Sequence, residues 1–121
     1  MLPPRKKPKK SGIERGPKLV WNRHRKFIRS RCCCVPGCDE GSIEVAHVRT
    51  AANSGTGIKP IDGYAVGLCH AHHMESHAIG DLTFQAKYRI NLMKLAGEYV
   101  AASPDWQLRD TMRTLRDWEA A

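Results

Sequence analysis

The sequence predicts an α+β fold, with a small zinc-stabilised core of two short strands and a helix. A basic helix precedes this core, and further helices follow it. Cysteines and histidines gather in two clusters about thirty residues apart. Apolar residues alternate at strand spacing between the clusters and recur at helical spacing after the second one. A chain of 121 residues fits one domain, and its modest core would gain stability from a structural metal.

Positive charge is concentrated near the N-terminus. Residues 1–31 hold twelve Lys/Arg and one acid, Glu14, which gives +11, whereas the rest hold eight Lys/Arg and eleven Asp/Glu, which gives −3. Residues 1–18 also hold four prolines, so they predict a disordered basic arm. Such an arm gains affinity for a polyanion by counterion release, which favours nucleic acid over a membrane surface or a merely solubilising tail.

Cysteine usage and hydropathy indicate a cytoplasmic protein. No apolar run approaches the ~20 residues of a membrane span. No apolar stretch follows the charged N-terminus, so no secretory signal is predicted. Five cysteines at tight spacing fit metal ligation in a reducing compartment better than a disulfide framework.

The first half of the chain predicts a helix, a turn and two strands. Apolar residues among basic ones predict a helix over residues 19–31. Pro36-Gly37 marks a turn within residues 33–38. Alternation predicts a strand over residues 43–48, and a second strand over residues 64–68 would pair with it.

The second half predicts three helices. A short helix should begin near Ala71 and end near Gly80, and a longer one should cover residues 82–101. Ser103 as N-cap and Pro104 at the first helical position predict a last helix. The chain thus divides into an arm (1–18), a domain (19–102) and a C-terminal helix (103–121) that packs on the domain or on a partner, for example in a homodimer.

Two short-spaced pairs predict a structural zinc site. Such sites use thiolates and imidazoles, and Cys33-x4-Cys38 and Cys69-x2-His72 supply them. The predicted strand pair would bring the two pairs together. Cys32 and Cys34 are alternatives to Cys33 as the partner of Cys38, and an unused thiol would be a small buried hydrophobe.

The other histidines of the second cluster predict a separate, open metal site. Helix residues four apart share a face, so His73 and His77 can reach one ion. Adjacent residues are turned by about 100°, so His72 can serve the zinc while His73 faces elsewhere. His70 is expected to be exposed, and His24 is expected to be exposed or to contact nucleic acid.

The order of these motifs resembles the HNH nucleases of the ββα-metal (His-Me finger) superfamily, and among them the small phage and prophage proteins of YbcO type. About sixty residues carry the resemblance. They are Phe27-Ile28-Arg29, Cys33-x4-Cys38, Val45-Ala46-His47-Val48, Gly55-Thr56-Gly57-Ile58-Lys59-Pro60, Asp62, Leu68-Cys69-x2-His72-His73-x3-His77 and Phe84-x3-Tyr88.

The resemblance implies a role for several residues. His47 falls on the general base, and an imidazole suits that role because its ordinary pKa is near 6.5. Asp62 is the candidate to orient the base, with Tyr64 as the second choice. His73 and His77 fall on positions that hold the catalytic divalent ion, which would be Mg, Mn, Ni or Zn.

The resemblance therefore predicts a metal-dependent HNH-type DNA endonuclease, sequence-tolerant or structure-directed, that serves phage recombination or DNA processing in a bacterial host cell. Many relatives carry Asp or His before the base, where this chain has Ala46. The alternative is a non-catalytic, zinc-stabilised nucleic-acid-binding module with a decayed site, whereas a metal sensor leaves the basic arm unexplained. The residues expected to contact DNA are Lys6, Lys7, Lys9, Lys10, Arg23, Arg25, Lys26, Arg49 and Lys59.

Overall fold

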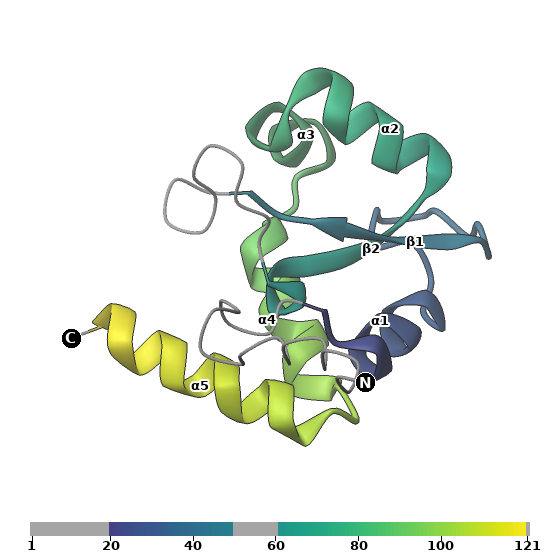
Figure 1. Cartoon of the computed structure of the whole chain (residues 1–121). Coiled ribbons are helices and arrows are strands. Elements are labelled where there is room, and N and C mark those ends of the chain that lie inside the picture. The colour runs from purple at the N-terminus through teal and green to yellow at the C-terminus, as the bar shows by residue number, and fades with distance from the viewer. Residues whose placement is uncertain (1–19, 50–60, 121) are drawn as a thin grey trace, which may run out of the picture.

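The computed structural model of the chain describes residues 20–49 and 61–120, and the side chains only as far as residue 115 (Figure 1). The fold is α+β, as predicted. The described elements are α1 (Asn22–Arg29), β1 (Ile43–His47), the 3-10 turn η1 (Asp62–Tyr64), β2 (Ala65–Cys69), α2 (His70–Ile79), α3 (Asp81–Tyr88), α4 (Leu92–Ala102) and α5 (Trp106–Ala120).

The two strands form an antiparallel sheet with a regular register, from Ile43 opposite Cys69 to His47 opposite Ala65. α2 and α3 lie on one side of this sheet, and α1, α4 and α5 lie on the other (Figure 1). All five residues of β2 are buried, because helices cover both of its faces. The strand pair and the helix after it agree with the prediction.

The two faces of β1 meet different helices. A Cβ on Gly67 would lie 2.9 Å from Ile43 and 3.2 Å from both Ile28 of α1 and Tyr99 of α4, so Gly67 permits close packing there. Glu44, the next residue of β1, instead contacts His73 of α2. Since strand residues alternate, the odd-numbered residues of β1 face α1 and α4, and the even-numbered ones face α2.

Two apolar clusters hold the layers together. The larger one joins both faces of the sheet and includes the fully buried Ile28 and Phe84. The smaller one packs α5 against α4 and the residues that precede α1 and η1, with Leu108 and Met112 inserted from α5. Burying each such side chain is worth about 1.5–3 kcal/mol. Within the described residues, no helix is long and apolar enough to cross a membrane.

The prediction of one helix over residues 82–101 is wrong, because the chain breaks between α3 and α4. Arg89 takes a left-handed conformation, with φ 56° and ψ 47°, which ends α3. The side chain of Asn91 then accepts the Lys94 N–H at 3.0 Å and caps α4. The apolar stripe continues across the break at helical spacing, so periodicity alone could not reveal it.

The predicted cap of the last helix is also wrong. α5 begins at Trp106, and its first turn is capped by Asp105, whose Oδ1 accepts the Leu108 N–H at 3.2 Å. The Ser103 hydroxyl lies 2.8 Å from Nδ1 of His24 instead. His24 is completely buried and not on the surface as expected, and burial lowers its pKa against the pull of the nearby carboxylates. The sequence could not show this pairing, because it joins α1 to the α4–α5 corner.

Candidate metal centre

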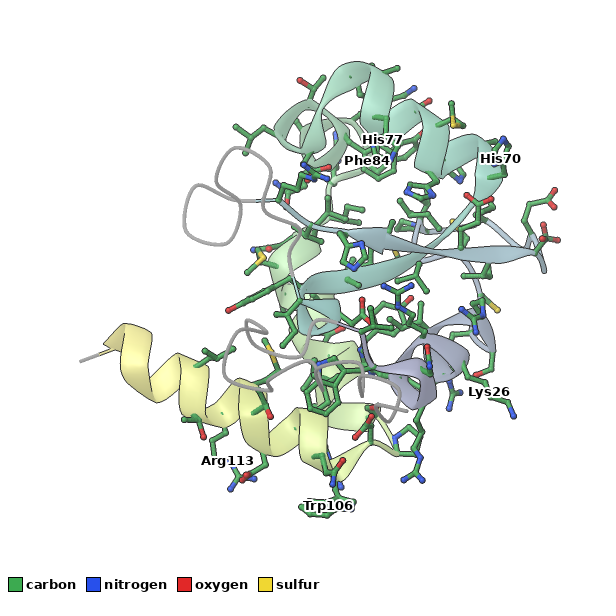
Figure 2. The ribbon with its side chains drawn as sticks, viewed as in Figure 1. Lys26, His70, His77, Phe84, Trp106 and Arg113 are labelled. Carbon is green, nitrogen blue, oxygen red and sulfur yellow. The ribbon has the colours of Figure 1, made fainter. Side chains whose placement is uncertain are left out.

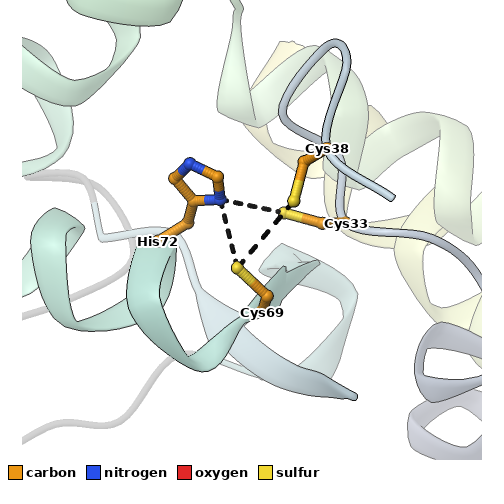
Figure 3. A group of neighbouring side chains, drawn as sticks. All are labelled: Cys33, Cys38, Cys69 and His72. Atoms are coloured by element: carbon orange, nitrogen blue, oxygen red, sulfur yellow. Dashed lines mark hydrogen bonds between the residues drawn. The ribbon is translucent and has the colours of Figure 1, made fainter. Parts of the chain in front are cut away.

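Four side chains converge where β2 meets α2 (Figure 3). The sulfur atoms of Cys33, Cys38 and Cys69 and Nδ1 of His72 all lie within 4.8 Å of one another. Nδ1 is 3.1 Å from the Cys69 sulfur and 3.5 Å from the Cys33 sulfur, and the Cys38 and Cys69 sulfurs are 4.0 Å apart. Ligand atoms around tetrahedral zinc lie roughly 3.4–3.8 Å apart. The cluster could therefore hold a metal ion such as zinc.

Local backbone geometry builds this cluster. Gly37 adopts φ 81°, and the Cys38 N–H donates to the Val35 carbonyl at 3.1 Å, which closes the turn. The Cys34 N–H donates to the Gly67 carbonyl at 2.9 Å and holds the turn against β2. Cys69 ends β2 and precedes the first turn of α2, so His72 lies one helical turn further on.

The structure selects Cys33 among the three adjacent cysteines. Cys32 is exposed and Cys34 is half-buried, and neither belongs to the cluster. Burial raises the pKa of the Cys33 thiol to about 11, so binding of a cation must release a proton from it. The His72 ring packs edge-on against Tyr88, with ring centroids 5.2 Å apart, which fixes the direction of Nδ1.

A second group of side chains lies further along α2. The Nε2 atoms of His73 and His77 are 3.2 Å apart, and Nδ1 of His73 donates to Glu44 Oε1 at 2.8 Å. Two nitrogen ligands about 2.1 Å from one ion lie roughly 3.0–3.4 Å from each other. A carboxylate on Nδ1 leaves the lone pair of His73 on Nε2, the atom that faces His77. The two imidazoles are thus close enough either to hydrogen-bond each other or to share one ion.

The sequence did not predict a role for Glu44. Its second oxygen lies 3.0 Å from Nδ1 of His70, so the exposed His70 also has a partner. Hydrogen bonds from His73 and His70 lower the pKa of Glu44 below its ordinary value. The one available signal was strand alternation, which places Glu44 on the opposite face of β1 from Ile43 and His47.

A third group surrounds Asp62, which is completely buried in η1. Nε2 of His47 lies 2.8 Å from its Oδ1. Arg25 donates to both carboxylate oxygens, at 2.6 and 2.9 Å, and the Trp21 N–H donates to Oδ2 at 2.7 Å. Burial raises the pKa of Asp62, but the hydrogen bonds from His47, Arg25 and Trp21 outweigh it and lower the pKa to about 2.

The second and third groups are reached from different faces of the sheet. Glu44 is three residues before His47 in a regular strand, so their side chains point to opposite faces. Asp62 links His47 to Arg25 of α1. His73 and His77 instead belong to α2, on the other side of the sheet, where Figure 2 labels His77. Among the described residues, no hydrogen bond or ion pair joins His47 to His73 or His77. The structure therefore brings His47 together with Asp62 and His73 together with His77, on side chains that strand alternation assigns to opposite faces of β1.

The predicted DNA contacts fall into three kinds. Arg23 and Lys26 are exposed on α1, and Arg49 is exposed just after β1, where its N–H donates to Asp81 at 3.1 Å. Arg25 is engaged by Asp62. The others lie outside the described residues, namely Lys6, Lys7, Lys9, Lys10 and Lys59.

Comparison of the chain with protein-family models, with curated proteins and with solved structures finds no match. The protein is therefore classified by its fold and by its cluster of possible metal ligands. It is an α+β domain with a three-cysteine, one-histidine cluster that could hold zinc.

Proposed function

We propose that this protein is a metal-dependent DNA endonuclease of HNH type, in which zinc is structural and a second divalent ion is catalytic. The observation that carries the proposal is the pair of imidazole nitrogens of His73 and His77, 3.2 Å apart on one helix. Glu44 supports it, because it orients His73 as a carboxylate orients a metal-bound histidine. Cys69 and His72 of the cluster lie at the start of the same helix, so a metal there would hold this pair in place.

His47 and Asp62 would provide the base. Asp62 accepts from Nε2 of His47, which leaves Nδ1 to take a proton from water. Because the pKa of Asp62 is about 2, its carboxylate stays charged and stabilises the imidazolium that forms. His73 and His77 would hold a divalent ion, which would supply charge stabilisation at the phosphate and the leaving oxygen. This chemistry requires a phosphate placed at the end of β1, within reach of both His47 and the ion. The basic residues near the N-terminus supply affinity for the DNA backbone without reading its sequence.

A non-catalytic, zinc-stabilised nucleic-acid-binding module is the second candidate. It is favoured by the orientation of His47, which turns away from the face that carries His73 and into the buried network of Asp62. Ala46 favours it as well, because its methyl group offers no metal ligand beside His47. Both candidates share the zinc cluster and the basic arm, so only catalysis distinguishes them.

Cleavage of single-stranded, duplex and branched DNA tests the proposal, with Mg, Mn or Ni ions present. We expect the parent protein to cut, and His47→Ala and His73→Ala to lower the rate by about 100- to 10,000-fold. His70→Ala is the matched control, because this exposed histidine of the same helix lies outside the ligand pair. Equal rates for the parent and His47→Ala would remove the proposed base. A parent protein that cuts nothing under these conditions would favour the binding module.

A further inference from the structure

An exposed tryptophan stands at the start of α5. Trp106 is 60% exposed, whereas Trp21 in the core is 6% exposed. Figure 2 shows Trp106 at one edge of the molecule, in the same half of the view as Lys26 and Arg113. His70 and His77 lie in the other half. An indole ring left in solvent offers a large flat apolar surface with one polar N–H, which suits stacking against another ring.

The backbone under this ring is held firmly. Asp105, 8% exposed, accepts the Leu108 N–H, and the Ser103 hydroxyl accepts the Asp105 N–H at 3.2 Å. The opposite side of the helix is anchored by Leu108 and Met112 in the smaller core cluster. The exposed ring is therefore presented by a fixed first turn of helix and is not part of a loose terminus.

A polar hollow of ≈ 350 Å³ lies beside the ring. Val20, Asn22 and Arg23 line it from α1 and the segment just before it, and Asp105, Trp106 and Gln107 line it from the start of α5 and the residue before it. The amides of Asn22 and Gln107 can both donate and accept hydrogen bonds. Its one carboxylate, on Asp105, is already engaged by the Leu108 N–H. Apolar, amide and cationic groups thus surround one small hollow.

The surface around the hollow is cationic. Residues 20–31 include five Arg/Lys and no Asp/Glu, and only Arg25 among them is paired with a described acid, Asp62. On α5, Arg109 and Arg113 follow Trp106 by three and seven residues and so share its side of the helix. Asp110 partly neutralises the charge of Arg113, because its Oδ1 lies 3.9 Å from the guanidinium and both side chains are exposed. This excess of cations complements phosphate.

We propose that Trp106 and this hollow bind an unpaired nucleotide of a DNA strand. The base would stack on the indole ring, and the adjoining phosphates would lie against Arg23 and Arg109. A paired base in a blunt duplex is stacked on both sides, so the site would select single-stranded, frayed or branched DNA. Stacking is tolerant of sequence because every base has a flat face. The inference shares with the proposed function only the premise that DNA is the partner, and it does not require cleavage.

Binding to fluorescent DNA tests the inference, with the full zinc-loaded protein and no added divalent ion. The probes are an oligothymidylate of about twenty nucleotides and a blunt hairpin duplex of similar charge. We expect Trp106→Ala to weaken binding of the single strand by about 5- to 150-fold and binding of the duplex by less than about two-fold. Trp106→Phe, which keeps a ring, should retain most of the affinity. Leu82→Ala is the matched control, because Leu82 is an apolar side chain of α3 that is 82% exposed.

Three results would overturn the inference. The first is single-strand affinity that Trp106→Ala leaves unchanged, and the second is an equal loss for the duplex. The third is a change of oligomeric state in sedimentation on Trp106→Ala, because it would make the ring a contact between two copies of the chain. A parent protein that binds neither probe would refute both this inference and the proposed function. A parent protein that binds the single strand through Trp106 but never cuts would refute the nuclease alone.

Discussion

Asp62 joins three parts of the chain through one carboxylate. It binds Arg25 and the Trp21 backbone at the start of the domain, and it binds His47 at the end of β1. A charge with no exposure is costly unless it is fully paired, and here each oxygen has partners. The residue predicted to orient a base thus also fastens α1 to the sheet.

Replacement of Asp62 should be strongly destabilising. Asp62→Ala leaves the Arg25 guanidinium and the Trp21 N–H without their partner, and we expect the free energy of unfolding to fall by about 3–5 kcal/mol. Urea unfolding of the zinc-saturated protein at neutral pH measures this. Asp110→Ala is the control, since the Asp110 side chain is exposed and pairs with the exposed Arg113, and it should change stability by less than about 0.5 kcal/mol.

The pH dependence of this loss follows from the pKa of Asp62, which is lowered from 3.8 to about 2. A carboxyl group whose pKa falls on folding stabilises the fold fully above its unfolded pKa, and this contribution is lost as pH falls towards the folded pKa. The stability difference between the parent and Asp62→Ala should therefore persist from about pH 8 down to about pH 5 and close only at lower pH. A difference that closes within that range would mean that Asp62 is not held ionised.

At the scale of elements, the joint between β2 and α2 organises the site. The strand ends at Cys69, and the helix that follows carries His72 on one side and His73 on another. The turn around Gly37 reaches this joint through Cys33 and Cys38. A metal there would link segments about thirty residues apart in a chain with a small core.

Loss of one cluster thiol should therefore unfold the domain. We expect Cys38→Ser to lose zinc and most of its cooperative thermal transition, because the ion would no longer tie the turn to α2. Metal analysis and circular dichroism measure the two effects together. Cys32→Ser is the matched control, because Cys32 is exposed and outside the cluster. Equal zinc content in the two variants would show that the cluster is not the zinc site.

Across the whole molecule, the features predicted from the sequence are those with local causes. Short ligand spacings marked Cys38, Cys69 and His72 but left Cys33 as one of three adjacent choices, and strand alternation marked the paired strands. The break between α3 and α4 rests on one left-handed residue, Arg89, inside a continuous apolar pattern.

The features that were missed depend on contacts between distant segments. His24 pairs with Ser103, 79 residues away, and Glu44 pairs with His73, 29 residues away. A basic helix predicts an exposed His24, and only the packing of α1 against the α4–α5 corner reverses that expectation. The orientation of His47 also depends on packing, because strand alternation fixes opposite faces for Glu44 and His47 without saying which face meets α2.

Binding of a second ion to the zinc-loaded protein tests most directly whether α2 carries two metal sites with different roles. Calorimetric titration with manganese or nickel should detect about one further, weakly held ion per chain in the parent protein. His73→Ala should abolish that ion and keep the tightly held zinc, whereas His70→Ala should keep both. The account is contradicted if the parent protein binds no second ion, or if His73→Ala loses the zinc and keeps the weaker ion.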